Sequence, residues 1–233
     1  MTTTTTTTNA QNRQTNVLLF DMDGVILEGW GTDASVHTEA LTETLEMYDI
    51  TPEPNIRSAL DTYEYTETFV SACETIGVDP AEFYADREAR SATRAINRLK
   101  AGERGLYADA NSLETLAEEY TLGLVSNNYD PTVTFVVDHF GIDVFSFVRG
   151  RDTGVEGFSR RKPEPDYLLE GLSALDAESG FYIGDRETDI IAGKRAGLEP
   201  IFIRRSHNRS LSLSVEPAYE ITSLSELLSI VSP

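Results

Sequence analysis

Five short apolar runs recur along the chain and constrain its fold more than any other feature. They read NVLLF, YTLGLV, DVFSFV, GFYI and PIFI, and helical stretches separate most of them. Apolar runs of this length that do not alternate with polar residues are typical of strands buried on both faces of a parallel sheet. Their alternation with helices predicts an α/β fold built on a doubly wound parallel sheet.

One segment departs from this alternation. Residues 29–104 hold no predicted strand, and apolar side chains recur there at the spacing of amphipathic helices, as at Val36, Ala40, Leu41, Leu45, Phe69 and Cys73. Glycines flank the segment, and glycine tolerates the backbone changes that a hinge requires. We therefore predict a helical cap over residues 29–104, inserted into a core of residues 17–28 and 105–233. A helical elaboration packed rigidly on the core is the alternative.

The start of the chain and its single cysteine indicate the cellular setting. The stretch MTTTTTTTNAQNRQTN lacks the apolar centre of a signal peptide and predicts a disordered, threonine-rich tail over residues 1–16. No apolar run reaches the ~18 residues that a membrane helix needs. Cys73 is the only cysteine, so neither an intrachain disulfide nor a cysteine metal cluster can form. We expect a cytoplasmic protein with no membrane partner.

The formal net charge of -20 is the second strong feature of the sequence. A chain this negative repels itself unless salt screens its charges. Lys100, Lys162 and Lys194 are the only lysines, and threonine is frequent. This composition resembles that of proteins from salt-adapted proteomes, and an ordinary acidic protein is the alternative. In either case we expect no nucleic-acid partner, because binding to phosphate backbones depends on a basic surface.

Polar side chains follow three of the apolar runs, where parallel strands end at the ligand-binding edge of a sheet. They are Asp21 and Asp23 after VLLF, Ser126, Asn127 and Asn128 after LGLV, and Asp185 and Asp189 after FYIG. Because side chains two residues apart in a strand share a face, Asp21 and Asp23 are expected to face the same crevice. We expect Lys162 to join them from a neighbouring loop.

These residue types suit phosphoryl transfer. Several carboxylates without histidine or cysteine favour a hard cation such as Mg²⁺, which attracts phosphate. Ser126 and Asn127 offer hydrogen bonds to phosphoryl oxygens, and Lys162 offers a point charge. One carboxylate can attack phosphorus while its neighbour transfers protons. For Asp21 and Asp23 taken alone, solvated acids at the end of a strand are the alternative.

Four motifs carry a family resemblance. DMDGV, SNN, KPEPD and GDRETD stand in the order of the four motifs of the haloacid dehalogenase-like superfamily, which the chain resembles over nearly all of its length after residue 16. The resemblance implies a Rossmann-like core with an inserted helical cap of the C1 type. It also implies a Mg²⁺-dependent phosphatase, similar to phosphoglycolate phosphatases, that acts on a small phosphorylated metabolite.

The resemblance assigns the acidic residues. Asp21 would be the nucleophile that forms an aspartyl-phosphate. Asp23 would protonate the leaving oxygen and then activate water, and its main-chain carbonyl would bind Mg²⁺ beside the carboxylates of Asp21 and Asp185. Asp189 would complete the acidic cluster, through water or through Lys162.

The resemblance also assigns the groups that hold the phosphoryl group. Ser126 would bind the phosphoryl oxygens with assistance from the Asn127 amide. Lys162 would stabilise the charge between Asp21 and the phosphoryl group. Gly24 would give the backbone room to turn beside them.

Other activities of the family and other protein classes remain as alternatives. Asp23 argues against a dehalogenase, and the position of Lys100 argues against a phosphonate-cleaving enzyme that forms a Schiff base. A phosphomutase resembles a phosphatase at all four motifs and stays open. A receiver-like module with a phosphorylated aspartate is shorter than this chain and has no helical insert. A catalytically silent relative would lack the nucleophile or a metal ligand, and this sequence lacks neither.

Five further residues have no assigned role. Trp30 either covers the site entrance or packs the insert on the core, and His37 is either structural or catalytic. Arg160 and Arg161 either hold a second anionic group of the substrate or offset the acidic surface. Arg186 either gates the site or pairs with acids.

Overall fold

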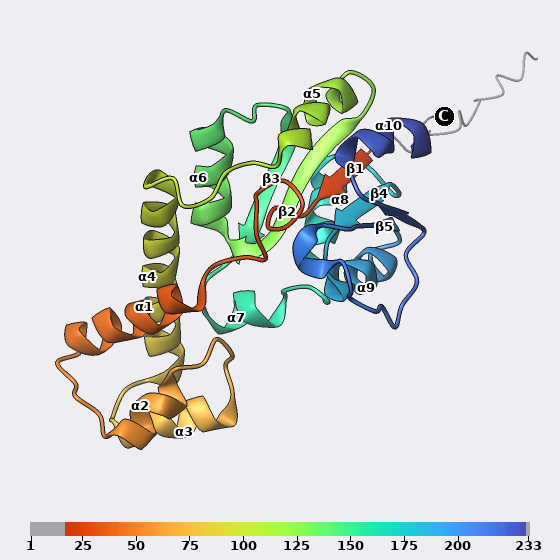
Figure 1. The fold of residues 1–233 in the computed structure, drawn as a ribbon. Coiled ribbons are helices and arrows are strands. Elements are labelled where there is room, and N and C mark those ends of the chain that lie inside the picture. The colour runs from red at the N-terminus through yellow and green to blue at the C-terminus, as the bar shows by residue number, and fades with distance from the viewer. Residues whose placement is uncertain (1–16, 232–233) are drawn as a thin grey trace, which may run out of the picture.

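Six parallel strands form one sheet in residues 17–231, the part of the chain that this computed structural model describes (Figure 1). Across the sheet they are β3 (Phe145–Arg151), β2 (Thr121–Tyr129), β1 (Val17–Phe20), β4 (Phe181–Gly184), β5 (Glu199–Ile203) and β6 (Tyr219–Ile221). The predicted doubly wound parallel sheet is confirmed, and the five apolar runs form β1 to β5. β6 was missed because only Ile221 of its three residues is buried. The tail predicted for residues 1–16 lies outside the described residues.

Helices cover both faces of the sheet, as the apolar runs require. Side chains of β1 alternate: Leu18 and Phe20 belong to one hydrophobic cluster, and Val17 and Leu19 to another. The first cluster lies under α5 (Ser112–Ala117), α6 (Asp130–Phe140) and α10 (Leu227–Ile230), with the 3₁₀ turns η1 (Ala108–Asn111) and η3 (Leu224–Glu226). The second lies under α8 (Asp166–Ala174) and α9 (Glu187–Arg195).

The strand order places the end of β1 at the centre of the molecule. β1 pairs with β2 on one side and with β4 on the other, so the direction of winding reverses here. The carboxyl ends of strands at such a reversal line a crevice. Asp21, the first residue after β1, donates its main-chain N–H to the carbonyl oxygen of Ile183 at 2.9 Å. The segments DMDGV, SNN and GDRETD, which follow or end β1, β2 and β4, therefore lie side by side.

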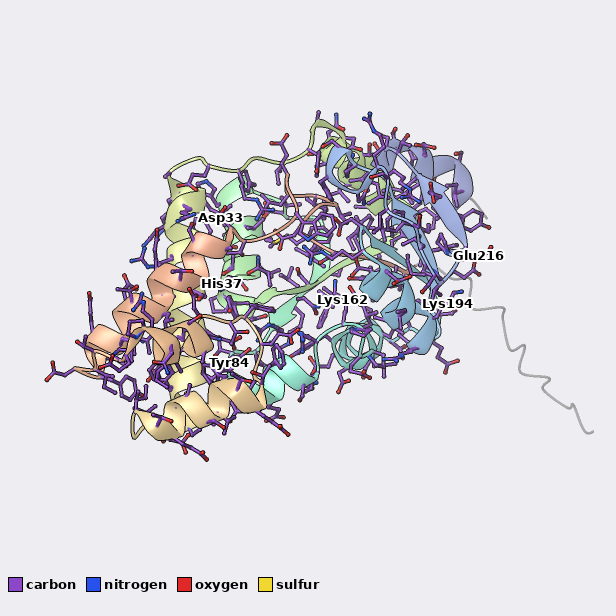
Figure 2. The ribbon with its side chains drawn as sticks, turned by 60° about the horizontal axis from the view of Figure 1, so that its bottom comes forward. Asp33, His37, Tyr84, Lys162, Lys194 and Glu216 are labelled. Atoms are coloured by element: carbon purple, nitrogen blue, oxygen red, sulfur yellow. The ribbon has the colours of Figure 1, made fainter. Side chains whose placement is uncertain are left out.

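Four helices are inserted between β1 and β2, and no strand is described within residues 29–104. They are α1 (Ala34–Met47), α2 (Pro54–Leu60), α3 (Glu67–Thr75) and α4 (Pro80–Lys100). α1 and α4 begin at aspartates whose side chains accept main-chain N–H groups of the first turn, as helix N-caps do. Figure 1 shows the four helices to one side of the sheet, and Figure 2 shows His37 and Tyr84 in the insert and Lys162 in the core.

The insert has its own hydrophobic cluster and also packs on the core. Its cluster joins side chains of all four helices, among them Leu41, Leu60, Phe69 and Tyr84. Phe158 of α7 (Gly154–Ser159), a helix of the core, packs against this cluster. The insert is therefore a compact unit, and α7 is one of its contacts with the core.

A buried ion pair also joins the insert to the core. Arg151 at the end of β3 pairs with Glu88 of α4, and the side chains of both are almost fully buried. Glu88 also accepts the main-chain N–H of Gly154 at 2.7 Å. The two linkers that connect insert and core run from β1 to α1 and from α4 to η1. The boundaries at residues 29 and 104, and the hinge role of the glycines, stay predictions.

The helices are too polar to be membrane spans. α4, with 21 residues, is the longest helix described, and charged side chains recur along it. Among residues 17–231, no helix has the length and apolar character needed to cross a bilayer.

Candidate active site

Asp21 and Asp23 face one cavity at the end of β1. Both line it and are almost fully buried, whereas Met22 between them packs into the hydrophobic core. Gly24 then takes φ +76°, a conformation that favours glycine. A Cβ atom on Gly24 would lie 2.1 Å from Oδ2 of Asp185. Glycine is therefore required here for the turn and for the close approach of the β4 loop.

Lys162 reaches the same place from the loop between α7 and α8. Its ammonium lies 3.1 Å from Asp21 Oδ1 and 2.7 Å from Asp189 Oδ1. It also donates to the hydroxyl of Tyr182 at 2.6 Å, and that hydroxyl donates to the carbonyl oxygen of Val125 at 3.0 Å. Burial alone lowers the pKa of Lys162, but the two carboxylates outweigh it and raise that pKa. Lys162 therefore carries its charge between the two acids.

The end of β2 contributes three polar residues in a row. Ser126 is buried, and its hydroxyl accepts the main-chain N–H of Asn128 at 3.3 Å. The side chain of Asn127 accepts the main-chain N–H of Lys162 at 2.9 Å and donates to the carbonyl oxygen of Lys162 at 3.0 Å. Asn127 thus fixes the loop that carries Lys162.

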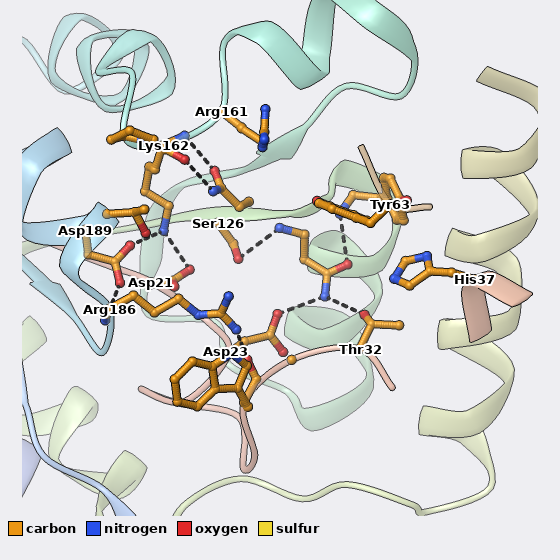
Figure 3. Close-up of a pocket in the computed structure, with 17 residues that line it drawn as sticks. Asp21, Asp23, Thr32, His37, Tyr63, Ser126, Arg161, Lys162, Arg186 and Asp189 are labelled. Carbon is orange, nitrogen blue, oxygen red and sulfur yellow. Dashed lines mark hydrogen bonds and ion pairs between the residues drawn. The ribbon is translucent and has the colours of Figure 1, made fainter. Parts of the chain in front are cut away.

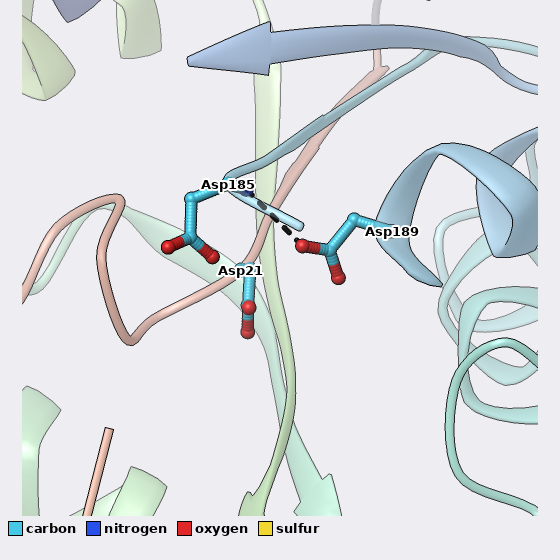
Figure 4. A group of neighbouring side chains, drawn as sticks. All are labelled: Asp21, Asp185 and Asp189. Atoms are coloured by element: carbon cyan, nitrogen blue, oxygen red, sulfur yellow. Dashed lines mark hydrogen bonds between the residues drawn. The ribbon is translucent and has the colours of Figure 1, made fainter. Parts of the chain in front are cut away.

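The carboxylates of Asp21, Asp185 and Asp189 converge, as Figure 4 shows. Asp21, Asp185 and Asp189 each offer one oxygen, and these oxygens all lie within 4.8 Å of one another. Oδ2 of Asp189 accepts the main-chain N–H groups of Asp185 at 3.1 Å and Arg186 at 2.9 Å, which shapes the loop after β4. A Cβ atom on Gly184 would lie 2.6 Å from that oxygen, so glycine is needed at this position too.

The cluster is costly to charge in the absence of a cation. Burial raises the pKa of Asp189 to about 6, and the attraction of Lys162 only partly opposes this effect. Burial likewise raises the pKa of Asp185, against the hydrogen bond from His207. Oδ1 of Asp185 is buried and has no hydrogen-bond partner among the described residues.

Asp23 is held separately from this cluster. Its Oδ1 lies 2.7 Å from the guanidinium of Arg104, and its Oδ2 accepts the side-chain amide of Asn128 at 2.9 Å. The same amide nitrogen lies 3.3 Å from the hydroxyl of Thr32 in the linker to the insert. The Asp23 carboxylate therefore contacts both the sheet and the exit linker of the insert.

Core and insert together enclose the cavity, whose volume is about 380 Å³ (Figure 3). The core supplies Asp21, Asp23, Asp189, Ser126, Asn127, Lys162 and the two arginines Arg161 and Arg186. The insert and its entry linker supply Trp30, Gly31, Thr32, His37 and Tyr63. A cavity of this size is within the range of small-molecule sites.

The arginines that the sequence left open separate into two groups. Arg160 does not line the cavity; it pairs with Asp166 and Glu170 on the surface. Arg161 lines the cavity and donates to the carbonyl oxygen of Phe158 at 2.7 Å. Its guanidinium lies 3.8 Å from the carboxylate of the exposed Glu64.

Trp30, Arg186 and His37 all line the cavity. Trp30 is about half exposed, and Arg186 donates to its carbonyl oxygen while the guanidinium lies 5.0 Å from the centre of the indole. His37 Nδ1 lies 3.2 Å from the hydroxyl of Ser91, and the ring packs edge-on against Tyr63. Burial, with the charges of nearby arginines, lowers the pKa of His37 to about 4. This histidine is neutral at pH 7.

Some site residues carried no usable signal in the sequence. Arg104 and His207 lie far along the chain from the acids that they contact, and no motif includes either of them. Tyr182 belongs to an apolar run that was interpreted only as a strand. Asn128 stands inside SNN, so its place in the motif was the one available signal.

The family model described as "Haloacid dehalogenase-like hydrolase" matches residues 18–203. The phosphoglycolate phosphatase of Vibrio vulnificus is 32% identical over 117 residues, which cover 48% of this chain and 49% of that protein. That of Vibrio cholerae is 32% identical over 124 residues, 51% of this chain and 53% of that protein. The chain thus spans about half the length of these curated relatives.

Solved structures show the same fold at low sequence identity. CbbY from Rhodobacter sphaeroides in complex with phosphate superposes with a TM-score of 0.62 at 20% identity, covering 91% of this chain and 96% of that one. A predicted phosphoglycolate phosphatase from Haemophilus somnus gives 0.62 at 18% identity, covering 94% and 99%. The resemblance drawn from the four motifs is confirmed by the family model, which covers well over half of the chain. The chain therefore belongs to the haloacid dehalogenase-like hydrolase family.

Proposed function

We propose that this protein is a Mg²⁺-dependent phosphatase that hydrolyses a small phosphomonoester through an aspartyl-phosphate on Asp21. One observation carries the proposal: Asp21, Lys162 and Ser126 meet in a single cavity beside the acidic cluster, although they come from three separate segments. A nucleophile, a fixed positive charge and a hydroxyl donor are what phosphoryl transfer requires of a protein.

The reaction has two steps. In the first, a carboxylate oxygen of Asp21 attacks phosphorus, the bond from phosphorus to the leaving oxygen breaks, and Asp23 gives that oxygen a proton. In the second, Asp23 takes a proton from water, and the water oxygen attacks phosphorus. The bond from phosphorus to Asp21 then breaks, which releases inorganic phosphate and returns Asp21 as a carboxylate and Asp23 in the protonated form in which it began.

The carboxylates support a site for Mg²⁺. Asp21 uses Oδ1 for its contacts with Lys162 and with the main-chain N–H of Met22, which leaves Oδ2. Asp185 has the buried Oδ1 that lacks a hydrogen bond. An all-oxygen set of this kind suits a hard divalent cation. We propose these two carboxylates and the main-chain carbonyl of Asp23 as its ligands; when bound, Mg²⁺ neutralises charge on the phosphoryl group.

The remaining predicted residues take supporting roles in this proposal. Oδ1 of Asp189 lies 2.7 Å from the ammonium of Lys162, much closer than any described lysine or arginine comes to Oδ1 of Asp185. Oδ2 of Asp189 accepts main-chain N–H groups, so Asp189 holds Lys162 and the β4 loop beside the cation. Ser126 binds the phosphoryl oxygens. Asn127 places Lys162 through its two hydrogen bonds to the main chain.

Phosphoglycolate is the first substrate to test. The curated relatives are named phosphoglycolate phosphatases, and Arg161 faces the cavity with no carboxylate of residues 17–231 closer than 3.8 Å. With the phosphoryl group at Asp21, the substrate's carboxylate would lie toward Arg161. Walls formed by Thr32, His37 and Tyr63 support the predicted role of residues 29–104 as a cap. A cytoplasmic location stays a prediction of the sequence.

The decisive experiment follows phosphate release and the covalent intermediate together. Purified protein is mixed with radiolabelled phosphoglycolate and Mg²⁺, quenched in acid, and tested for protein-bound label that hydroxylamine removes, as it does from acyl phosphates. Asp21→Asn should form no label and release no phosphate. Asp23→Asn should turn over about 10²–10⁴-fold more slowly, because general acid–base catalysis contributes that much.

Metal removal provides the second half of the test. Chelation by EDTA should abolish phosphate release and added Mg²⁺ should restore it. Full activity after chelation, or normal turnover by Asp21→Asn, would refute the proposal. A product that is an isomeric phosphate ester in place of inorganic phosphate would indicate the phosphomutase alternative.

A further inference from the structure

His207 contacts the carboxylate of Asp185, although no sequence motif includes it. His207 lies in the 3₁₀ turn η2 (Ser206–Asn208) after β5, and its Nε2 lies 2.6 Å from Asp185 Oδ2. The Asp185 side chain is fully buried, and that of His207 is partly buried, with 15% of it exposed. With the carboxylate ionised, Nε2–H is the donor of this hydrogen bond. Asp185 is therefore oriented by a partner from another loop.

The turn that carries His207 is itself fixed to the loop after β4. The side-chain amide of Asn208 donates to the carbonyl oxygens of Asp185 at 2.9 Å and Ile203 at 3.0 Å. Its side-chain oxygen accepts the main-chain N–H of Arg205 at 2.7 Å. Main chain and side chain of Asp185 are thus both held from the same turn.

A stack of side chains continues from His207 to the insert. The indole of Trp30 packs edge-on against the imidazole of His207, with ring centres 5.3 Å apart. Arg186 lies against the indole and donates to the carbonyl oxygen of Trp30. Trp30 belongs to the entry linker, so this stack joins the linker to the side chain that holds Asp185.

The hydrogen bond from His207 decides which oxygen of Asp185 can bind a cation. Oδ2 is occupied by His207, whereas Oδ1 is buried without a hydrogen bond from the described residues and has only the guanidinium of Arg186, at 3.8 Å, as a charged partner. A carboxylate fixed through one oxygen cannot rotate freely, so the other oxygen keeps its direction. Partners of this kind orient metal ligands, and their loss typically weakens metal binding by about 10–100-fold.

We propose that His207 is a positioning residue for the cation site: it holds Asp185 so that Oδ1 faces the cation, and Trp30 keeps His207 in place. This inference rests on the Mg²⁺ site of the proposed function. It assigns His207 a role through Asp185 and no contact with substrate. It also predicts that a linker residue without contact to Asp185 affects metal affinity.

Magnesium titration by isothermal calorimetry tests the inference without relying on turnover. His207→Leu keeps the volume but removes the donor, and should raise the Kd for Mg²⁺ by about 10–100-fold. His207→Gln keeps an N–H group near the position of Nε2 and should bind Mg²⁺ nearly as the wild type does. His139→Leu, at an exposed histidine in the last turn of α6, is the matched control.

Two further measurements separate positioning from damage to the fold. If His207 acts only on the metal, saturating Mg²⁺ should restore kcat in His207→Leu toward the wild-type value. Trp30→Leu should weaken Mg²⁺ binding in the same direction, while Trp30→Phe should retain it. Should His207→Leu not fold, the comparison of the two Trp30 variants still tests the stack.

The outcomes distinguish this inference from the proposed function. Wild-type affinity for Mg²⁺ in both His207→Leu and Trp30→Leu would overturn the inference and leave the phosphatase proposal intact. No Mg²⁺ binding by the wild type would overturn both. Equal losses in His207→Leu and His207→Gln would show that the N–H group is not what matters, and would also overturn the inference.

Discussion

The carboxylate of Asp23 lies 2.7 Å from the guanidinium of Arg104, a residue of the linker that leaves the insert. Arg104 also donates from Nε to the carbonyl oxygen of Glu28 at 2.6 Å, so it connects the exit linker with the entry linker. The carboxylate that we propose for proton transfer is thus held by the insert's connection to the core. This geometry makes Arg104 a positioning residue for Asp23.

Replacing Arg104 should therefore affect turnover more than metal binding. In Arg104→Leu we expect kcat to fall by about 10–100-fold, because small displacements of a catalytic group cost that much. The Kd for Mg²⁺ should not change. Arg98→Leu is the control: Arg98 lies in the last turn of α4 and pairs with Asp33 and Glu39 away from Asp23. Equal kcat values in the two variants would contradict the role of Arg104.

Arg161 should determine preference between substrates. Losing a hydrogen bond to a charged group costs about 1.5–3 kcal/mol, or about 10–100-fold in affinity. Arg161→Ala should raise KM for phosphoglycolate by that factor and leave KM for p-nitrophenyl phosphate, which has no second anion, unchanged. The neighbouring Arg160→Ala serves as control because Arg160 pairs with Glu170 outside the cavity. An equal rise in KM for both substrates would exclude a role of Arg161 that is specific to the second anionic group.

The buried pair of Glu88 and Arg151 should dominate the stability of the contact between insert and core. Glu88→Ala leaves a fully buried guanidinium without its carboxylate, which should lower the free energy of unfolding by about 3–5 kcal/mol. Glu39→Ala removes a partly exposed partner of Arg94 and should cost no more than about 1 kcal/mol. Urea denaturation monitored by circular dichroism gives both values. If Glu88→Ala lowered the free energy of unfolding by less than Glu39→Ala does, this account of the interface would be refuted.

His37 should make the fold sensitive to mild acid. Its pKa is lowered from 6.5 to about 4 in the folded chain, so the unfolded chain binds the proton first as the pH falls. The stability that a neutral His37 contributes is complete above pH 6.5 and is lost between there and pH 4. His37→Gln cannot take up the proton, so its melting temperature should fall less between pH 7 and pH 5 than that of the wild type. Identical shifts in both proteins would refute the prediction.

Salt should stabilise the protein through its net charge of -20. Folding brings the acidic groups closer together, and added ions screen their repulsion. The melting temperature should rise with potassium chloride and level off by roughly 0.5–1 M, where the Debye length is already near 3 Å. The apparent affinity for Mg²⁺ should fall over the same series. A melting temperature that stays constant or drops would reject the salt-adaptation hypothesis and leave the phosphatase proposal unaffected.

Local sequence patterns were sufficient to predict the parallel sheet and the run of helices between β1 and β2. Uninterrupted apolar runs have few ways to be buried other than in a central parallel strand, and helical spacing predicts an amphipathic helix without knowledge of its partner. The family resemblance implied that Gly24 gives the backbone room to turn; its φ is +76°, and a Cβ atom at this position would meet the side chain of Asp185. β6 was missed because its short, mostly exposed segment carries no such pattern.

The tertiary structure alone decided which residues hold the predicted ones in place. Asp21 and Asp185 could be predicted as candidate site residues from their positions after strands. The contacts of Asp23 with Arg104 and of Asp185 with His207, in contrast, join segments far apart in the chain. A hydrogen bond or an ion pair leaves no periodicity in the sequence, because it needs only two side chains whose distance the packing of the whole fold sets. For the same reason Arg160 and Arg161, adjacent in sequence, could not be told apart until the loop after α7 directed one to the surface and the other to the cavity.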